Sequence, residues 1–306
     1  MKAKNVKAVC RRKFNHFLKH VEDDAAQKAI EENTIITGGA IASMLRGEPI
    51  HDFDLYFRTK DATRIAAEYF VAQFSKNPPP RFARGDKVDI TVRVEEDRVS
   101  TIVKSAGVAS ESQQESEYQY FETTDPEAGD AAEYTEAVFQ VVQDAEPQED
   151  KPKYRPVFLS KNAITLSDKI QLVTRFFGEP DEIHANYDFV HCTNYWTSWD
   201  NQLVFRPEAV EALLAKELRY TGSRYPLCSV IRTRKFVQRG WAVTAGQYLK
   251  MVMQLQELDL NDIDVLEEQL TGVDTAYFQE VIDALRKRDD KRVDAAYLVE
   301  LIDRIF

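Results

Sequence analysis

Residues 34–57, TIITGGAIASMLRGEPIHDFDLYF, decide the fold expected of this 306-residue chain. The β-branched run Thr34–Thr37 predicts a short strand that ends in two glycines, Gly38 and Gly39. A helix is expected over Ala40–Arg46, because Gly47 and Pro49 follow it. The apolar run Phe53–Phe57 predicts a second strand that includes the second acid of an Asp-x-Asp pair.

The two acids of this pair, Asp52 and Asp54, are expected to project from the same side of the second strand, since side chains alternate across a strand. Two carboxylates held close together repel each other, and a divalent cation such as Mg²⁺ or Mn²⁺ relieves that repulsion. Glycine lets a backbone approach a phosphate closely, and the N-terminus of a following helix attracts anions. A phosphate cradle beside metal-binding carboxylates is what nucleotidyl or phosphoryl transfer requires.

The order of these parts resembles the DNA polymerase β-like nucleotidyltransferase superfamily. Within it, the spacing is most similar to the head of CCA-adding enzymes and bacterial poly(A) polymerases, and to nucleotidyltransferase-like proteins of bacteriophages. The resemblance implies an α+β, nucleotidyltransferase-fold mixed sheet with flanking helices. It also implies that Asp52 and Asp54 are catalytic metal ligands and that Gly38 and Gly39 hold an NTP. CCA-adding enzymes commonly carry Arg-Asp in the helix where this chain has Ala42-Ser43.

A third acid completes the pattern of that superfamily, and the chain offers two candidates. Asp188 and Asp89 each lie in an apolar run that predicts a strand, over 187–190 and 88–94. We favour Asp188 as a catalytic residue and metal ligand, because its surroundings are similar to a segment of phage nucleotidyltransferase-like proteins. Further nucleotide-binding candidates are Ser43 and Lys169, the latter at the start of a helix expected over 168–177. His191 is interpreted as a structural histidine.

The rest of the chain divides into a head over 1–206 and a helical region over 207–306, with an acidic insertion at about 105–153. In the head, helices are expected over 7–32 and, capped by Asp61, over 62–74, a hairpin over 88–94 and 99–103, and strands over 155–159 and 163–166. In the second region, helices are expected over 207–217, 227–238, 244–257, 261–270, 274–287 and 294–305.

Charge is distributed unevenly along the chain, whose net charge is −11. Between Ser105 and Asp150 there are 13 acids and no Lys or Arg, and outside that segment the cations outnumber the acids by two. Two stretches are strongly basic, and each is interpreted either as a solvated face or as a surface that binds phosphate backbones. The first holds Lys2, Lys4, Lys7, Arg11, Arg12, Lys13 and Lys19, and the second holds Lys216, Arg219, Arg224, Arg232, Arg234, Lys235 and Arg239. An RNA or protein acceptor is therefore expected along residues 216–239.

Other classes of protein are disfavoured. No stretch approaches 18 apolar residues, so no membrane span is expected. The three cysteines are widely spaced and form no Cys-x-x-Cys pair, which favours a reducing cytoplasm, that of the host if the chain is phage-encoded.

The leading hypothesis is a metal-dependent transfer of NMP from an NTP to a hydroxyl, with release of pyrophosphate. The alternatives are a catalytically inactive nucleotide- or protein-binding module on the same fold, and a structural protein in which the acids coordinate an ion. The aromatic group Tyr195, Trp196 and Trp199 is interpreted mainly as core, with base stacking as the alternative.

Overall fold

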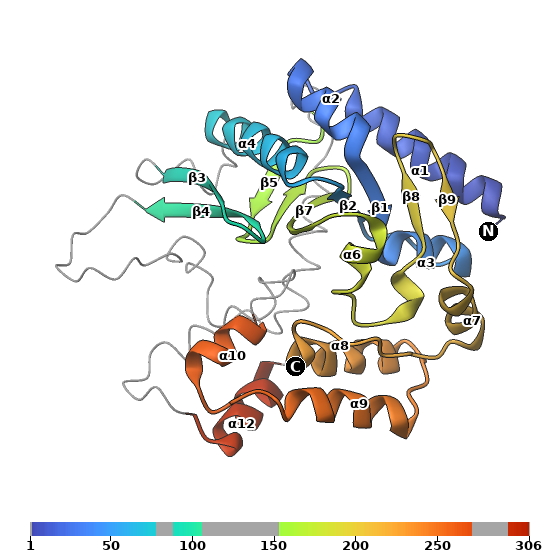
Figure 1. Ribbon diagram of the computed structural model, residues 1–306, viewed down its shortest axis with the longest axis vertical. Helices are drawn as coiled ribbons and strands as arrows, with labels where there is room; N and C mark the ends of the chain where they lie inside the picture. Colours follow the sequence, from blue (N-terminus) through green and yellow to red (C-terminus); the bar gives the residue numbers. More distant parts are fainter. Residues whose placement is uncertain (1, 78–87, 106–152, 271–292, 306) are drawn as a thin grey trace.

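The computed structural model describes residues 2–77, 88–105, 153–270 and 293–305 (Figure 1). Seven described strands form one mixed sheet in the order β5-β6-β7-β2-β1-β8-β9, and β3 and β4 form a separate pair. The strands of the sheet are β1 (Thr34–Thr37), β2 (Phe53–Phe57), β5 (Pro156–Leu159), β6 (Ala163–Leu166), β7 (Ile170–Phe177), β8 (Tyr195–Thr197) and β9 (Leu203–Val204). The separate hairpin is β3 (Val88–Val94) and β4 (Val99–Ser105).

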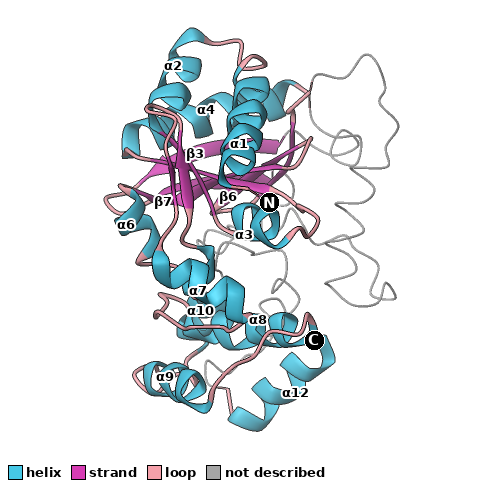
Figure 2. Ribbon diagram, turned by 90° about the vertical axis from the view of Figure 1, so that its right-hand side faces the viewer, coloured by secondary structure: helices cyan, strands magenta, loops and turns pink. Residues whose placement is uncertain are grey.

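Helices cover both faces of this sheet and continue beyond it (Figures 1 and 2). In the head they are α1 (Ala3–Leu18), α2 (Asp24–Asn33), α3 (Gly39–Arg46), α4 (Lys60–Lys76), α6 (Pro180–His184) and the 3₁₀ helix η2 (Val190–Cys192). After the sheet come α7 (Pro207–Ala215), α8 (Pro226–Gln238), α9 (Ala245–Leu255), α10 (Ile263–Leu270) and α12 (Ala295–Ile305). The α+β class, with a mixed sheet and a helical C-terminal region, is confirmed.

The two central strands send their side chains to opposite faces in alternation. β1 runs antiparallel to β2, and β2 runs parallel to β7. Ile36 and Leu55 enter the core on one face, whereas Ile35 and Tyr56 enter the core on the other. Asp54 is two residues before Tyr56 in β2, so it belongs to the second face, as the alternation predicts.

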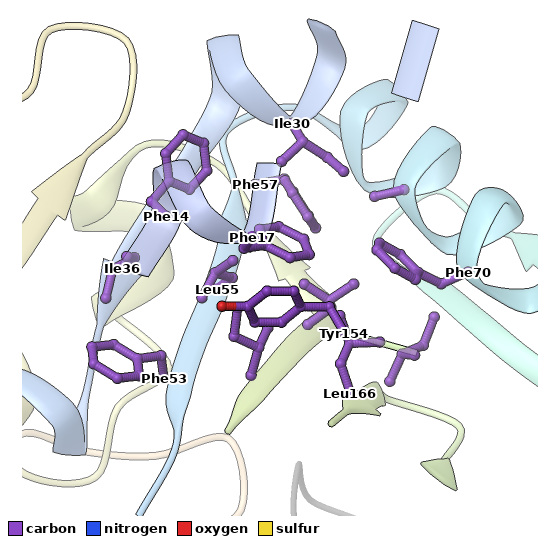
Figure 3. Packing of buried hydrophobic residues seen from close by; sticks show 14 of the residues in the cluster. Phe14, Phe17, Ile30, Ile36, Phe53, Leu55, Phe57, Phe70, Tyr154 and Leu166 are labelled. Carbon is purple, nitrogen blue, oxygen red and sulfur yellow. The ribbon is translucent and has the colours of Figure 1, made fainter. Parts of the chain in front are cut away.

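The first face is covered by α1, α2 and α4, and Figure 3 shows its core from close by. The rings of Phe17 from α1 and Phe70 from α4 stack with centroids 5.9 Å apart. Phe14 meets Trp196 of β8 at 5.4 Å, and the Trp196 indole donates a hydrogen bond to Asn201. Aromatic pairs of this kind fix the helices on the sheet as well as burying apolar area.

The second face is covered by α6 and by the helices that follow the sheet. Ile35 and Tyr56 share a core cluster with Leu227 and Ile231 of α8, and with residues of α10 and α12. In Figure 1 this helical region lies beneath the sheet, on the side opposite α1, α2 and α4. Residues from both sides of the proposed boundary at residue 206 thus contribute to the second-face core, and the division into domains stays a prediction.

Local capping accounts for where several helices begin and end, and it corrects two expectations. The single helix expected over 7–32 is wrong: α1 ends at Leu18 and α2 starts anew, because the Asp23 side chain accepts a hydrogen bond from Ala26 N. The cap of α4 is Thr59 rather than Asp61, since the Thr59 side chain accepts from Ala62 N. Gly47, with φ of +73°, ends α3 as expected.

The helix expected over 168–177 is also wrong, because Ile170–Phe177 is the strand β7. Asp168 and Lys169 both have positive φ and form a tight turn between β6 and β7. The run that follows is mostly buried and pairs with strands on both sides, so tertiary pairing overrides its helical spacing. The strand expected over 187–190 is wrong too: only Phe189 makes a bridge, to Tyr220, and η2 follows.

The remaining elements largely match their expected positions. The hairpin β3–β4, the strands β5 and β6 and the helices α7 to α10 and α12 are confirmed within a few residues. No strand was expected over the residues of β8 and β9, which extend the sheet beside β1. Most of the acidic insertion at 105–153 and the helix expected over 274–287 lie outside the described residues. Among the described helices, none is both long enough and apolar enough to cross a membrane.

Trp196 ties the edge of the sheet to α1, so replacing it with alanine is expected to lower the free energy of unfolding by about 3–5 kcal/mol. Its side chain is among the largest that are fully buried. The matched control is Leu214→Ala in α7, where the leucine is 83% exposed and the expected change is within about 0.5 kcal/mol. Urea unfolding followed by circular dichroism measures both, and equal effects would contradict the packing described.

Candidate active site

The turn between β1 and α3 is shaped by Gly38. This residue has φ of +86° and ψ of −148°, a combination open essentially to glycine alone, and its N–H donates to the carbonyl of Cys192 at 3.0 Å. A Cβ atom placed on Gly38 would lie 2.9 Å from Oδ2 of Asp54, whereas one on Gly39 would meet nothing within 4 Å. The sharp turn therefore brings bare backbone against the Asp54 carboxylate.

The Asp-x-Asp segment lies beside this turn because of the register of the sheet. Thr37, the last residue of β1, is opposite Asp54 in β2. Asp52 directly precedes β2, and both acids are partly exposed, whereas Phe53 between them is buried in the first-face core. The structure thus brings Asp54 to the glycine turn, and it leaves the carboxylates of the pair accessible.

These residues fit a hard divalent cation. The donors are carboxylate oxygens, which Mg²⁺ prefers, and the Gly38 backbone leaves room that a side chain would fill. No group of three or more His, Cys, Asp or Glu able to hold a metal occurs among the described residues. Asp52 and Asp54 would accordingly share the ion with phosphate oxygens of a nucleotide and with water, as Mg²⁺ sites commonly do.

Asp188 lies near this place but already has partners. Its carboxylate accepts a hydrogen bond from Ser223 at 3.2 Å and forms an ion pair with Arg232 of α8, and its side chain is only 10% exposed. The pKa of the Cys192 thiol is raised to about 12, first by desolvation and then by the negative charges of Asp188 and Asp54. The charges of Asp188 and Asp54 therefore both act on Cys192, the residue whose carbonyl accepts the hydrogen bond from Gly38 N–H.

Asp89, the alternative third acid, lies in β3 opposite Lys104 of β4. This two-stranded sheet is separate from the sheet that carries Asp54. The assignment of either acid as the third carboxylate stays a prediction.

Two further nucleotide-binding candidates lie on elements that border the acids. Lys169 is at the turn before β7, its carbonyl accepts from Phe53 N at 2.9 Å, and its Nζ donates to the carbonyl of Ile50 at 3.2 Å. It is therefore held beside the Asp52 segment, although it opens a strand rather than the expected helix. Ser43 lies in the second turn of α3 and is partly exposed.

Sequence reasoning missed a polar group beneath the glycine turn. Thr37 Oγ1 and His184 Nε2 are hydrogen-bonded at 2.8 Å in the interior, and the buried hydroxyl of Tyr187 lies close to Gly38. The pKa of His184 is lowered to about 3, first by burial and then by the positive charge of Arg206. Burial, with the nearby Tyr56 and Asp54, raises the pKa of Tyr187 well above 10. No local pattern connects residues 147 positions apart, so only the fold brings them together.

Three of the seven cations expected to bind an acceptor along 216–239 form ion pairs within the described part of the protein. Arg219 bonds to Glu211 and Glu217, Arg224 lies 3.6 Å from Asp97, and Arg232 pairs with Asp188. Arg234 and Arg239 remain exposed on the surface of α8 and at its end.

The aromatic residues and His191 are mainly structural. Trp196 is core, while Trp199 lies under the Arg58 guanidinium, 4.5 Å from its ring centroid. His191 is 2% exposed, and its ring lies 4.3 Å from that of Trp241 and 5.0 Å from that of Phe236. Burial, together with the Arg46 charge, lowers the pKa of His191 to about 3.

A family model described as "Gabija anti-defense 2 family protein" matches residues 8–216, more than half of the chain and all of the candidate site. The chain belongs to the Gabija anti-defense 2 family. A curated relative, Gabija anti-defense 2 of Bacillus phage SPbetaL7, is 17% identical over 139 residues. That match covers 45% of this chain and 33% of the relative, so this chain aligns with about a third of the relative's length.

Two solved structures resemble this Gabija anti-defense 2 family member weakly. The CCA-adding enzyme of Bacillus stearothermophilus in complex with CTP has a TM-score of 0.37 at 12% identity, over 84% of this chain and 48% of that one. The CCA-adding enzyme of Thermotoga maritima complexed with tRNA has the same TM-score and identity, over 95% of this chain and 68% of that one.

The close approach at Gly38 predicts a contrast between neighbouring glycines. Gly38→Ala is expected to lower the free energy of unfolding by about 1–3 kcal/mol, because of the positive φ and the contact with Asp54. Gly39→Ala is the matched control and should be neutral or slightly stabilising, since it lies in a helix with open space around its Cβ position. Thermal and urea unfolding compare them, and equal loss in both variants would contradict the geometry.

The buried histidines predict how stability depends on pH. Because the pKa of His191 is lowered to about 3 in the fold, the unfolded chain binds its proton first, and stability falls as pH drops below about 6.5. His191→Phe, in its aromatic pocket, should reduce the loss between pH 7 and pH 5 by about 2 kcal/mol. Replacing the exposed His20 with glutamine is the control, and a pH profile of urea unfolding that is the same in all three proteins would contradict the prediction.

Proposed function

We propose that this chain is a metal-dependent nucleotidyltransferase that transfers NMP from an NTP to a hydroxyl acceptor. The observation that carries the proposal is the contact between Gly38 and Asp54, where bare backbone and a carboxylate meet at the end of β1. A phosphate chain requires bare backbone and its metal requires a carboxylate, so the proximity of the two supports a shared site for both.

Each candidate residue has a role in this proposal. The backbone of Gly38 and Gly39 and the start of α3, with Ser43 in its second turn, would bind the phosphates of the nucleotide. Asp52 and Asp54 would hold Mg²⁺ or Mn²⁺, which supplies charge neutralisation at the reacting phosphate. Lys169, held beside the Asp52 segment by its bond to Ile50, adds a positive charge toward the phosphates.

The proposed reaction is a substitution at the α-phosphorus of the NTP. The acceptor hydroxyl oxygen forms a bond to that phosphorus, the bond from it to the bridging oxygen of the β-phosphate breaks, and pyrophosphate leaves. The hydroxyl proton passes to a base, and we assign this role to Asp188, whose carboxylate would have to exchange its ion pair with Arg232 for the hydroxyl.

The acceptor is an RNA 3′ end, a protein side chain or a small molecule. Family membership favours an acceptor that belongs to the host's anti-phage defence, since the family is described as anti-defense. Arg234 and Arg239 are cations of the 216–239 stretch that are exposed and belong to none of the described ion pairs, so they are available to such a partner.

A second candidate function is a binding module without catalysis on the same fold. It is favoured by the ion pair of Asp188 with Arg232, because a carboxylate held by a guanidinium is a poor base. Calorimetry with NTPs separates the two functions. Binding that requires Mg²⁺ and Asp54 favours the enzyme, and binding that persists in a metal chelator favours the module.

The proposal predicts that Asp54→Asn abolishes nucleotide transfer, with a fall of about 100-fold or more, because half of the carboxylate pair is lost. The assay supplies Mg²⁺, each α-labelled NTP and an extract of host RNA and protein, and follows label in any acceptor. Asp61→Asn is the matched control, since Asp61 is an exposed acid of α4 paired with Arg64.

Asp188→Asn separates the role of the third acid from that of the pair. If Asp188 is the base, Asp188→Asn should lower the rate and leave nucleotide binding unchanged. If Asp188 is only a structural partner of Arg232, the substitution should lower stability alone. Full activity in Asp54→Asn would rule out the enzyme proposal.

A further inference from the structure

The outer face of α1 carries a stripe of positive charge, here called the α1 stripe and defined by Lys4, Lys7, Arg11, Arg12 and Lys19. Lys4, Lys7 and Arg11 recur three or four positions apart, which places them on one side of the helix. Arg12 and Lys19, the C-cap of α1, line the same hollow. The opposite side of α1, with Val6, Cys10, Phe14 and Phe17, is buried in the first-face core. The position of the stripe is therefore fixed by the packing of the helix.

The α1 stripe has no internal neutralisation within the described structure. The helix contains no acid, and none of the five cations forms an ion pair with another described residue. The basic residues of 216–239 differ in this respect, since Arg219, Arg224 and Arg232 all face carboxylates. Positively charged side chains that form no ion pair with a described residue are therefore concentrated on α1.

The surface around the stripe is concave. A hollow runs along α1 and is lined by all five cations, together with Asn15 and with Asn201 from the turn between β8 and β9. From Lys4 to Lys19 the stripe extends about 22 Å at 1.5 Å per residue. That length matches about six nucleotides of a strand at 3.4 Å each.

We propose that the α1 stripe binds the phosphate backbone of a nucleic acid. Several Lys and Arg side chains, with amide side chains beside them, are the donors that contact phosphates without reading sequence. Interfaces between proteins are depleted in lysine and enriched in aromatic residues, and this hollow has no aromatic side chain apart from the imidazole of His16.

An anionic membrane is the less favoured partner for the same helix. Helices that bind membrane surfaces insert large apolar side chains from a face beside the basic one. Among the described residues, no exposed large apolar side chain belongs to α1, because its apolar face is already in the core. The stripe offers charge alone, which suits a polyanion in solution.

The inference is independent of the proposed catalysis, since α1 lies against the face of the sheet opposite that of Asp54. The test measures the anisotropy of fluorescent 20-nucleotide RNA and DNA, single- and double-stranded, with the full chain in chelator and without NTP. Binding at 25 mM salt is expected to weaken steeply as salt rises.

The decisive variant is Lys4→Gln with Arg11→Gln, which removes two exposed charges without changing helix propensity much. It should weaken binding about tenfold or more at low salt and reduce the slope of log affinity against log salt by about two. The matched control is Lys76→Gln with Lys250→Gln, which removes the same charge from exposed positions of α4 and α9 and should change affinity less than twofold.

Two outcomes would overturn the assignment. They are no binding by the wild type at the lowest salt, or equal loss in the stripe variant and its control. Binding to phosphatidylserine vesicles without binding to any oligonucleotide would assign the stripe to a membrane instead. Unchanged circular dichroism and melting temperature confirm that each variant is folded.

Discussion

The antiparallel pairing of β1 with β2 is the constraint on which the rest of the molecule depends. It places Thr37 opposite Asp54, so that the glycine turn at the end of one strand meets the acid near the start of the other. The same two strands alternate their apolar side chains between two cores, with Leu55 on one face and Tyr56 on the other. A slip of one residue would move the acid into the core under α1 and would remove both cores at once.

Beneath this pair, long-range contacts hold the turn in place. The Gly38 N–H donates to Cys192, and Thr37 Oγ1 meets His184, so the segment over 184–192 supports the turn from below. That segment is tied in turn to α8 through Asp188 and Arg232. The helical region thus reaches the glycine turn through one loop, in addition to covering the second face of the sheet.

The local part of this arrangement could be predicted from the sequence. Glycines, caps and alternating apolar residues act within a few positions, which is why β1, α3 and β2 were predicted at or within one residue of their bounds. Ile170–Phe177 was mistaken for a helix, because its pairing with β2 and β6 is not encoded in its own spacing. The partners of Asp188 could not be predicted for a similar reason: Arg232 is 44 positions away, and only the docking of α8 brings the two together.

The lack of space at Gly38 has a consequence for comparing relatives of this chain. A side chain there would meet Asp54 and would strain the backbone, so selection for folding alone retains glycine at this position whether or not any chemistry survives. Gly39 has open space around it, and folding does not demand it. Among relatives, a glycine retained at the position of Gly38 is explained by folding alone. A glycine retained at the position of Gly39 instead indicates a requirement for what the turn binds.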